Sequence, residues 1–265
     1  YSHMLNEAPT NFRKITHTHQ HWTYDVYICG EGPIVFLLHE IPNPTPEVYA
    51  LANRLSESGF MVHVPVFFGK VNTPFSIGRA ISELGLGCIR KEFSMFATQQ
   101  SSPVVDWIRS LCITRMTDTG QCKIGMIGMC VTGNFALGLC GEQWMQAPVL
   151  CQPSLPYPIS TKHKRALHIS KETLHKAKER DDLEIMGLRF SEDWMCPKER
   201  FKRLSNEFGD RFKAIEIDSS SENSHGIRTT AHAVLTMDFV DEDGHPTKEA
   251  WDTVRKFLNR KLKSD

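Results

Sequence analysis

Two patterns of apolar side chains alternate along this chain. Short, continuous apolar runs recur between stretches in which apolar residues return every three or four positions. A continuous run indicates a strand that is buried on both faces, and the longer spacing indicates a helix with one apolar face. The predicted buried strands cover residues 33–38, 60–65, 124–127, 147–151, 183–188 and 212–217.

The stretches between these runs predict helices. The clearest one begins at Thr45-Pro46 and has apolar residues with the i, i+3, i+4, i+7 spacing of one helix face: Val48, Leu51, Ala52 and Leu55. Other predicted helices begin after Ser102, cover 170–180 and 201–208, and end the chain at 250–262. Because strands and helices alternate, we predict an α/β fold with a mainly parallel central sheet and helices on both faces. We expect a single domain over 4–265, and we interpret residues 1–3 as an expression scar.

The N-terminal region departs from this alternation. Residues 15–21 and 23–29 alternate polar and apolar side chains, which predicts an antiparallel hairpin at the edge of the sheet. His17, His19 and His21 fall on one face of the first strand and are able to bind a metal. No carboxylate or cysteine accompanies them, so an exposed hairpin edge is the favoured interpretation and no metal site is predicted.

Residues 66–100 also interrupt the rhythm. Glycines and a proline punctuate this segment, with phenylalanines between them. A connection of this length between a strand and a helix often covers an active site. We therefore expect 66–100 to border the active-site mouth, with Arg90 and Phe93 as candidate substrate contacts.

Charge and cysteine usage narrow the range of functions. The 31 lysines and arginines balance 31 aspartates and glutamates, so no net field favours nucleic acid or an anionic membrane. No apolar run approaches the ~20 residues that span a bilayer, and we expect no signal peptide. The eight cysteines include no C-x-x-C pair, which favours reduced thiols over disulfides or a zinc site. We expect a cytoplasmic protein that binds neither nucleic acid nor membrane.

The most distinctive stretch is 123–137, which reads KIGMIGMCVTGNFAL. A short apolar run meets Gly128, Cys130 and Gly133, and small and apolar residues follow. This order predicts a strand, a tight turn and a helix, with a thiol at the tip of the turn. Small neighbours let strand and helix pass closely, and free amides at the helix start favour a thiolate or an oxyanion. A buried cysteine with no chemical role is the alternative.

Two further polar residues, Asp193 and His225, follow predicted strands. With Cys130 they give the order nucleophile, acid, histidine, which is the chain order of α/β-hydrolases. Glu192 competes with Asp193 for the acid position, and His232 competes with His225. We prefer His225 because the sequence around His232 has poorer loop character.

Each member of this set has a chemical task. His225 would take the proton of the Cys130 thiol and return it to the leaving group. Asp193 would fix the tautomer of the imidazole and stabilise its cation. The backbone amides of Val131 and of Ile41, which follows the strand at 33–38, are candidates for an oxyanion hole.

The same residues resemble those of the dienelactone hydrolases (carboxymethylenebutenolidases) from about residue 20 to 262. The matching motifs are His39-Glu40-Ile41, Gly128-Met129-Cys130-Val131-Thr132-Gly133, Asp193 with Cys196-Pro197, and Ser224-His225-Gly226. A cysteine in place of the commoner serine is the most specific feature. The resemblance implies the α/β-hydrolase fold and an esterase or lactonase with a triad of Cys130, Asp193 and His225. It also implies that Glu40 contacts the thiol in the resting enzyme.

Two features differ from the family's pattern. The elbow usually carries two glycines after Cys-x, and here the first is replaced by Thr132, whose branched side chain should crowd the turn or line the pocket. The family's founding activity uses arginines to hold a substrate carboxylate. Arg79, Arg90 and Arg228 are candidates for that role, and the sequence leaves the choice open.

The sequence therefore predicts a cysteine hydrolase that needs no cofactor and cleaves a small lactone or ester, as a monomer or a homodimer. A non-catalytic α/β-hydrolase-like protein that keeps the pocket for binding is the second interpretation. A redox sensor is a third, although no resolving partner for Cys130 is identified.

Overall fold

The computed structural model describes residues 8–76, 78 and 102–263. It divides into two compact units, Tyr1–Ile124 and Gly125–Asp265. Several predictions fall outside the described residues, namely the expression scar at 1–3, the contacts Arg90 and Phe93, and most of the 66–100 segment. That a single domain covers 4–265 stays a prediction.

The first unit carries strands in the order β1-β2-β4-β3. Their bounds are β1 (Arg13–His19), β2 (Trp22–Cys29), β3 (Ile34–Leu38) and β4 (Met61–Pro65). β2 pairs antiparallel with both β1 and β4, and β3 pairs parallel with β4. All of β3 is buried, as its continuous apolar run predicts, whereas β1 alternates between exposed and half-buried residues. The predicted antiparallel hairpin is confirmed.

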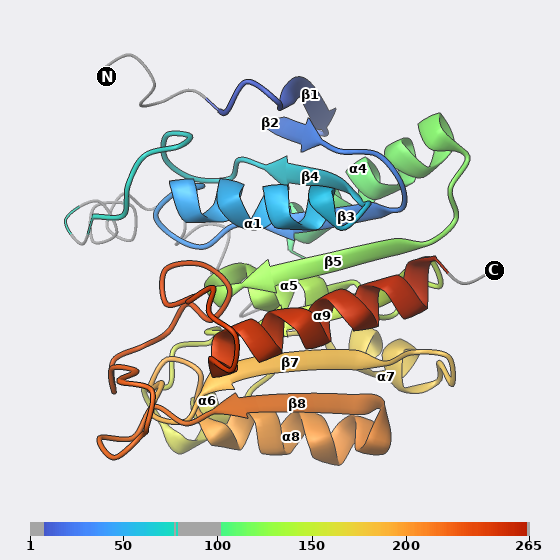
Figure 1. The fold of residues 1–265 in the computed structure, drawn as a ribbon. Coiled ribbons are helices and arrows are strands. Elements are labelled where there is room, and N and C mark those ends of the chain that lie inside the picture. Colours follow the sequence, from blue (N-terminus) through green and yellow to red (C-terminus); the bar gives the residue numbers. More distant parts are fainter. Residues whose placement is uncertain (1–7, 77, 79–101, 264–265) are drawn as a thin grey trace. The chain divides into compact units, whose positions relative to one another are not determined.

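Two helices flank these strands, α1 (Pro46–Glu57) on one face and α4 (Pro103–Thr119) on the other (Figure 1). Both start with a proline, whose missing N–H costs nothing in the first turn. α4 ends at Gly120, which has a φ of 72° and so adopts the left-handed conformation that closes many helices. The apolar face predicted for α1 is the face that is buried.

The hairpin is tied to α4 through one of the three N-terminal histidines. His17 Nε2 forms a hydrogen bond of 3.1 Å with the Ser110 hydroxyl, and the ring packs edge-on against Trp107. The Trp107 indole in turn donates to the His17 carbonyl oxygen at 3.3 Å. In residues 8–76, 78 and 102–263, no three His, Cys, Asp or Glu side chains form a potential metal-binding group.

The second unit carries strands in the order β5-β6-β7-β8. Their bounds are β5 (Ile124–Met129), β6 (Met145–Cys151), β7 (Ile185–Phe190) and β8 (Phe212–Ile217). β7 pairs parallel with both β6 and β8, and every residue of β5 and β7 is buried. Parallel strands end at the same edge of a sheet, so the loops that follow β6, β7 and β8 emerge together.

Helices cover both faces of these strands. Figure 1 shows α9 (Pro246–Leu262) on one face, and α5 (Gly133–Gly138) and α7 (Lys171–Lys178) on the other. α8 (Lys198–Phe208) packs on β8 and is followed by the short helix η2 (Gly209–Arg211), and α6 (Thr161–Arg165) lies beside α8. Ser170 caps α7 by accepting a hydrogen bond of 3.0 Å from the Thr173 amide. The predicted α/β-hydrolase class of fold, mainly parallel with an antiparallel N-terminal hairpin, is confirmed.

Two further observations bear on the sequence analysis. No helix of the described ranges is long and apolar enough to cross a membrane. The cysteines that the structure describes are all free thiols, and all but Cys122 are buried.

Candidate active site

Cys130 stands at the tip of the turn that follows β5, where the short helix η1 (Cys130–Thr132) begins. Its φ of 55° lies in the left-handed region that residues other than glycine rarely adopt. A Cβ atom added to Gly128 would lie 2.4 Å from the Thr132 carbonyl oxygen, and one on Gly133 would lie 3.0 Å from Pro153 Cα. Both glycines are therefore required for the close approach of strand, turn and helix. The predicted strand–turn–helix is confirmed.

Thr132 braces this turn. Its hydroxyl accepts a hydrogen bond of 2.9 Å from the Met129 amide and donates one of 2.8 Å to the Met129 carbonyl oxygen. The residue is fully buried. Both of these hydrogen bonds lie within the turn, and contact between Thr132 and substrate stays a prediction.

Asp193 lies in the loop after β7 and forms its short hydrogen bond with His232, at 2.7 Å between Oδ2 and Nδ1. Its other oxygen, Oδ1, accepts from the amides of Met195 at 3.0 Å and Cys196 at 3.4 Å. Asp193 is buried, so these bonds hold a carboxylate that has little access to water. This aspartate, rather than Glu192, is the acid that meets a histidine.

The prediction that His225 pairs with Asp193 is wrong. His225 is exposed, its amide donates to Asn223 Oδ1 at 3.1 Å, and its ring packs against His245. His232, seven residues further along the same loop, has a nearly buried side chain and takes the place beside Asp193. The long connection after β8 returns to the core before α9 begins, since Ala233, Val234 and Leu235 are buried.

The turn that carries His232 is held by hydrogen bonds to the side chain of Asp238. Asp238 Oδ2 accepts from the backbone amides of His232 and Ala233, both at 2.9 Å. Oδ1 accepts from the Arg228 guanidinium at 2.8 Å, so Arg228 is engaged in an ion pair within the loop. Contact between Arg228 and substrate stays a prediction, and Asp238 is a residue that the sequence analysis missed.

The electrostatics link His232 to Cys130. Burial would lower the pKa of His232, but the negative charge available on the Cys130 sulfur and the hydrogen bond to Asp193 raise it well above its ordinary value. His232 therefore accepts a proton more readily than an ordinary imidazole does. His232 Nε2 is buried and forms no hydrogen bond of good geometry with the described residues, so it is the nitrogen that remains available to the thiol.

The loop after β6 is attached to the elbow. The Ser154 amide donates to the Cys130 carbonyl oxygen at 3.0 Å. The side chain of Asn134, in α5, forms two hydrogen bonds with the backbone of Leu155, the residue after Ser154. Its Oδ1 accepts from the Leu155 amide and its Nδ2 donates to the Leu155 carbonyl oxygen, each at 2.9 Å. The burial of Tyr157, and its proximity to the charge of Cys130, raise the pKa of this tyrosine to about 12. The loop therefore forms one wall of the site.

Arg200 anchors that wall from α8. Its guanidinium donates to the carbonyl oxygens of Pro153 and Pro156, each at 2.6 Å, and to that of Ala166 at 3.0 Å. The side chain is fully buried, and burial lowers its pKa. Sequence patterns treat such an arginine as a surface residue, so its structural role was not predicted.

The other predicted residues lie at the expected places in the chain. Val131 follows Cys130 in η1 and is fully buried. Glu40 and Ile41 belong to the first unit and follow β3, with Glu40 buried and its carbonyl oxygen bonded to His39 Nδ1 at 2.8 Å. The oxyanion-hole roles of Ile41 and Val131, and the effect of Glu40 on the thiol, stay predictions.

Comparison with known proteins gives the fold and the family. Among solved structures, a protein of Klebsiella pneumoniae assigned as a dienelactone hydrolase is 14% identical, with a TM-score of 0.64 over 94% of this chain and 98% of that one. A dienelactone hydrolase-like promiscuous phosphotriesterase from metagenomic libraries is 15% identical, with a TM-score of 0.57 over 95% and 98%. An α/β serine hydrolase without a lid, from Xanthomonas campestris, is 9% identical, with a TM-score of 0.56 over 97% and 98%.

Solved structures with sequence identities this low establish the fold alone. Assignment of the chain to a family requires a match of sequence. No curated protein matches this sequence. The profile of the dienelactone hydrolase family, however, matches residues 29–262, which include Cys130, Asp193 and His232. This match covers most of the chain. The protein therefore belongs to the dienelactone hydrolase family.

Proposed function

We propose that this protein is a cysteine-dependent hydrolase that cleaves a small ester or lactone through a covalent acyl-enzyme. The observation that carries the proposal is Cys130 on a left-handed turn, together with a histidine whose pKa the sulfur raises. That histidine, His232, is bonded to Asp193 at 2.7 Å. A thiol, an imidazole and a carboxylate in series form the set that acyl transfer requires.

In the first half of the reaction, the Cys130 sulfur attacks the carbonyl carbon of the substrate. The thiol proton goes to Nε2 of His232, and the carbonyl π electrons move onto oxygen to give a tetrahedral oxyanion. Collapse of this intermediate breaks the bond to the alcohol oxygen, which leaves with the proton from His232. In a lactone, the alcohol stays attached to the acyl group through the opened ring.

In the second half, water replaces the alcohol. The oxygen of the water attacks the thioester carbon while His232 takes a proton from the water. The second tetrahedral intermediate then releases the Cys130 thiolate, which is reprotonated from His232. The carboxylic acid departs. Asp193 keeps Nδ1 of His232 protonated throughout, so that Nε2 alone exchanges protons. This route uses side chains and water, and requires no cofactor.

Membership of the dienelactone hydrolase family suggests two further roles in this mechanism. The amides of Val131 and Ile41 would donate to the oxyanion, and Glu40 would disfavour a thiolate until substrate arrives, because a nearby carboxylate raises a thiol pKa. The substrate would be a small molecule. A cytoplasmic location and a monomeric or homodimeric state remain expectations from the sequence.

A hydrolysis screen tests the proposal. Purified wild type and Cys130→Ala would be assayed side by side on p-nitrophenyl acetate, a panel of lactones and a phosphotriester. We expect turnover of at least one ester or lactone, lost on replacement of the sulfur. Turnover that survives in Cys130→Ala, or that is confined to the phosphotriester, would contradict the proposal. No turnover of any substrate would favour the non-catalytic binding protein.

A further inference from the structure

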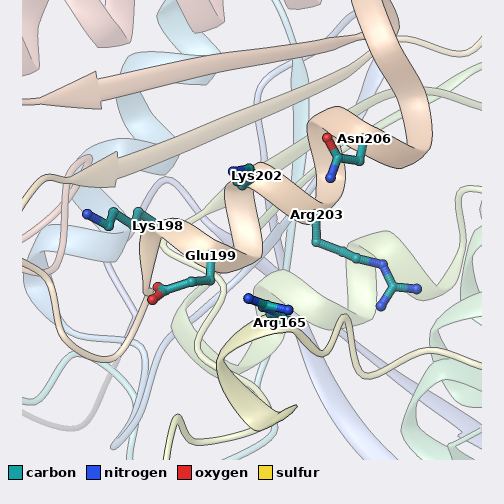
Figure 2. A pocket seen from close by; sticks show the side chains of 6 residues that line it. All are labelled: Arg165, Lys198, Glu199, Lys202, Arg203 and Asn206. Atoms are coloured by element: carbon teal, nitrogen blue, oxygen red, sulfur yellow. The ribbon is translucent and has the colours of Figure 1, made fainter. Parts of the chain in front are cut away.

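The helix α8 has two faces of opposite character. The residues that point into the unit are Arg200, Phe201, Leu204 and Phe208. The outer face carries Lys198, Glu199, Lys202, Arg203 and Asn206, and together with Arg165 these residues line a pocket of about 630 Å³. Figure 2 shows Arg165, the last residue of α6, across from α8 and between the side chains of Glu199 and Arg203. The volume is that of a site for a small organic molecule.

This pocket is separate in composition from the active site. None of its lining residues belongs to the set formed by Cys130, Asp193 and His232. Binding of a ligand in this pocket can consequently be measured without turnover, whether or not the protein hydrolyses an ester or lactone.

The charge of the lining is strongly positive. Four of the six residues are cations and one is a carboxylate. Arg203 is partly neutralised, because its Nε donates to Glu207 at 2.8 Å. Among the cations of the lining, Arg203 alone forms an ion pair with an acidic side chain of the residues that the structure describes, and Arg165, Lys198 and Lys202 form none. A concave surface that keeps several unneutralised charges of one sign concentrates counter-ions.

The spacing of these cations identifies the kind of anion. Lys198 and Lys202 are one helical turn apart, which is about 6 Å along the axis, and Arg203 follows directly. Arg165 faces them from a second helix (Figure 2). Linked phosphates carry more than one negative charge and place their charged oxygens several ångströms apart, which suits cations that stand on two helices. Arginine offers a planar fork to a phosphate and lysine offers a mobile point charge.

We propose that this pocket binds a phosphorylated small molecule with two or more phosphate charges, held between Arg165 on α6 and Lys198, Lys202 and Arg203 on α8. Glu199 and Asn206 also line the pocket and carry acceptor oxygens. An extended polyanion is disfavoured, because the cations gather in one hollow of a chain whose net charge is zero.

Calorimetric titration of the full chain with pyrophosphate, and separately with inorganic phosphate, tests the inference at low salt. We expect saturable binding of one pyrophosphate, about tenfold or more tighter than that of phosphate. Lys202→Gln and Arg165→Gln should each weaken pyrophosphate binding by about fivefold or more. The matched control is Lys164→Gln, which removes the same charge from the same helix but lies outside the pocket lining and should change affinity by less than about twofold.

One variant guards against loss of folding as an explanation. Glu199→Gln removes the only carboxylate of the lining and should tighten pyrophosphate binding by about twofold or more, which a damaged protein would not do. The proposal is overturned if pyrophosphate does not saturate wild type below about 10 mM, or if phosphate binds as tightly. Equal weakening by Lys164→Gln and Lys202→Gln would likewise overturn it, because it would reduce the effect to non-specific attraction.

Discussion

Replacing Asp238 by alanine should disable the active site without removing any member of the proposed triad. Asp238 Oδ2 accepts two backbone hydrogen bonds of 2.9 Å, from His232 and Ala233, and these fix the turn that carries the imidazole. The carboxylate itself is mostly buried, with 11% of its side-chain surface exposed. Without it, two amide donors lose their acceptor and His232 loses its constraint.

The magnitude follows from these contacts. Each hydrogen bond to a charged acceptor contributes about 1.5–3 kcal/mol, so Asp238→Ala removes roughly 3–6 kcal/mol of local interactions, of which water can restore a part. A displacement of His232 by about 1 Å would cost on the order of 100-fold in kcat/KM. Asp238→Asn keeps one carbonyl oxygen for the amides, and we expect a loss within about tenfold.

Arg228→Ala is the matched control. It removes the third bond of Asp238, but 69% of the Arg228 side chain is exposed, so the ion pair contributes less than about 1 kcal/mol. The assay is kcat/KM on one ester, with thermal unfolding to verify that each variant is folded at the assay temperature. Wild-type kcat/KM in Asp238→Ala, or an equal loss in Arg228→Ala, would refute the reasoning.

Three further predictions concern the framework and the thiol. Arg200→Lys should lower the free energy of unfolding by about 2–4 kcal/mol in urea titrations, because an ammonium cannot span the carbonyls that the guanidinium bridges, and an unchanged value would contradict this role. His39 is neutral in the folded protein, since burial lowers its pKa to about 4 and its Nε2 accepts from the Phe67 amide. In the unfolded chain the same histidine binds a proton below about pH 6.5, so the free energy of unfolding falls as pH drops from about 6.5 to about 4. In urea titrations at pH 7 and pH 4, the loss should be about 3 kcal/mol smaller in His39→Gln than in wild type, because His63 and His168, whose pKa values burial also lowers, contribute equally to both proteins. Equal losses in the two proteins would disprove it. Glu40→Gln should speed iodoacetamide labelling of Cys130 near neutral pH, and identical labelling profiles in the two proteins would remove Glu40 from the mechanism.

Much of the fold was predictable because its physical causes are local. The continuous apolar run of β3 and the spaced apolar residues of α1 each determine a face to bury, and both elements form where these patterns lie. The elbow was predictable for the same reason. Gly128 and Gly133 stand where a Cβ atom would collide with the neighbouring backbone, and Cys130, which lies between them, takes the left-handed conformation.

The choice of histidine was not predictable in this way. His225 and His232 occupy one long connection between β8 and α9, and no periodic pattern distinguishes them. The choice depends on Asp238, whose carboxylate accepts a hydrogen bond from the backbone amide of His232. It also depends on Asp193, which bonds to the His232 ring from a different loop. Interactions of this kind join residues that carry no shared sequence signal. An aspartate six residues after a histidine is a weak hint by itself.

The pocket and the wall of the site escaped the sequence analysis because both depend on charged residues of α8. Arg200 and Lys202 look alike in a helical pattern, yet one is buried against carbonyl oxygens and the other lines an open cavity. Which face of α8 is buried was apparent from Phe201 and Leu204. What the arginine and lysine side chains meet beyond the helix required the structure.

The measurement that tests the account most directly compares two histidine variants on one ester. His232→Ala and His225→Ala would be assayed for kcat/KM beside wild type, under identical conditions and at the same protein concentration. We expect His232→Ala to lose several orders of magnitude, because a thiol without its base acts poorly, and His225→Ala to stay within about threefold of wild type. Loss of activity in His225→Ala with full activity in His232→Ala would contradict the assignment of the site.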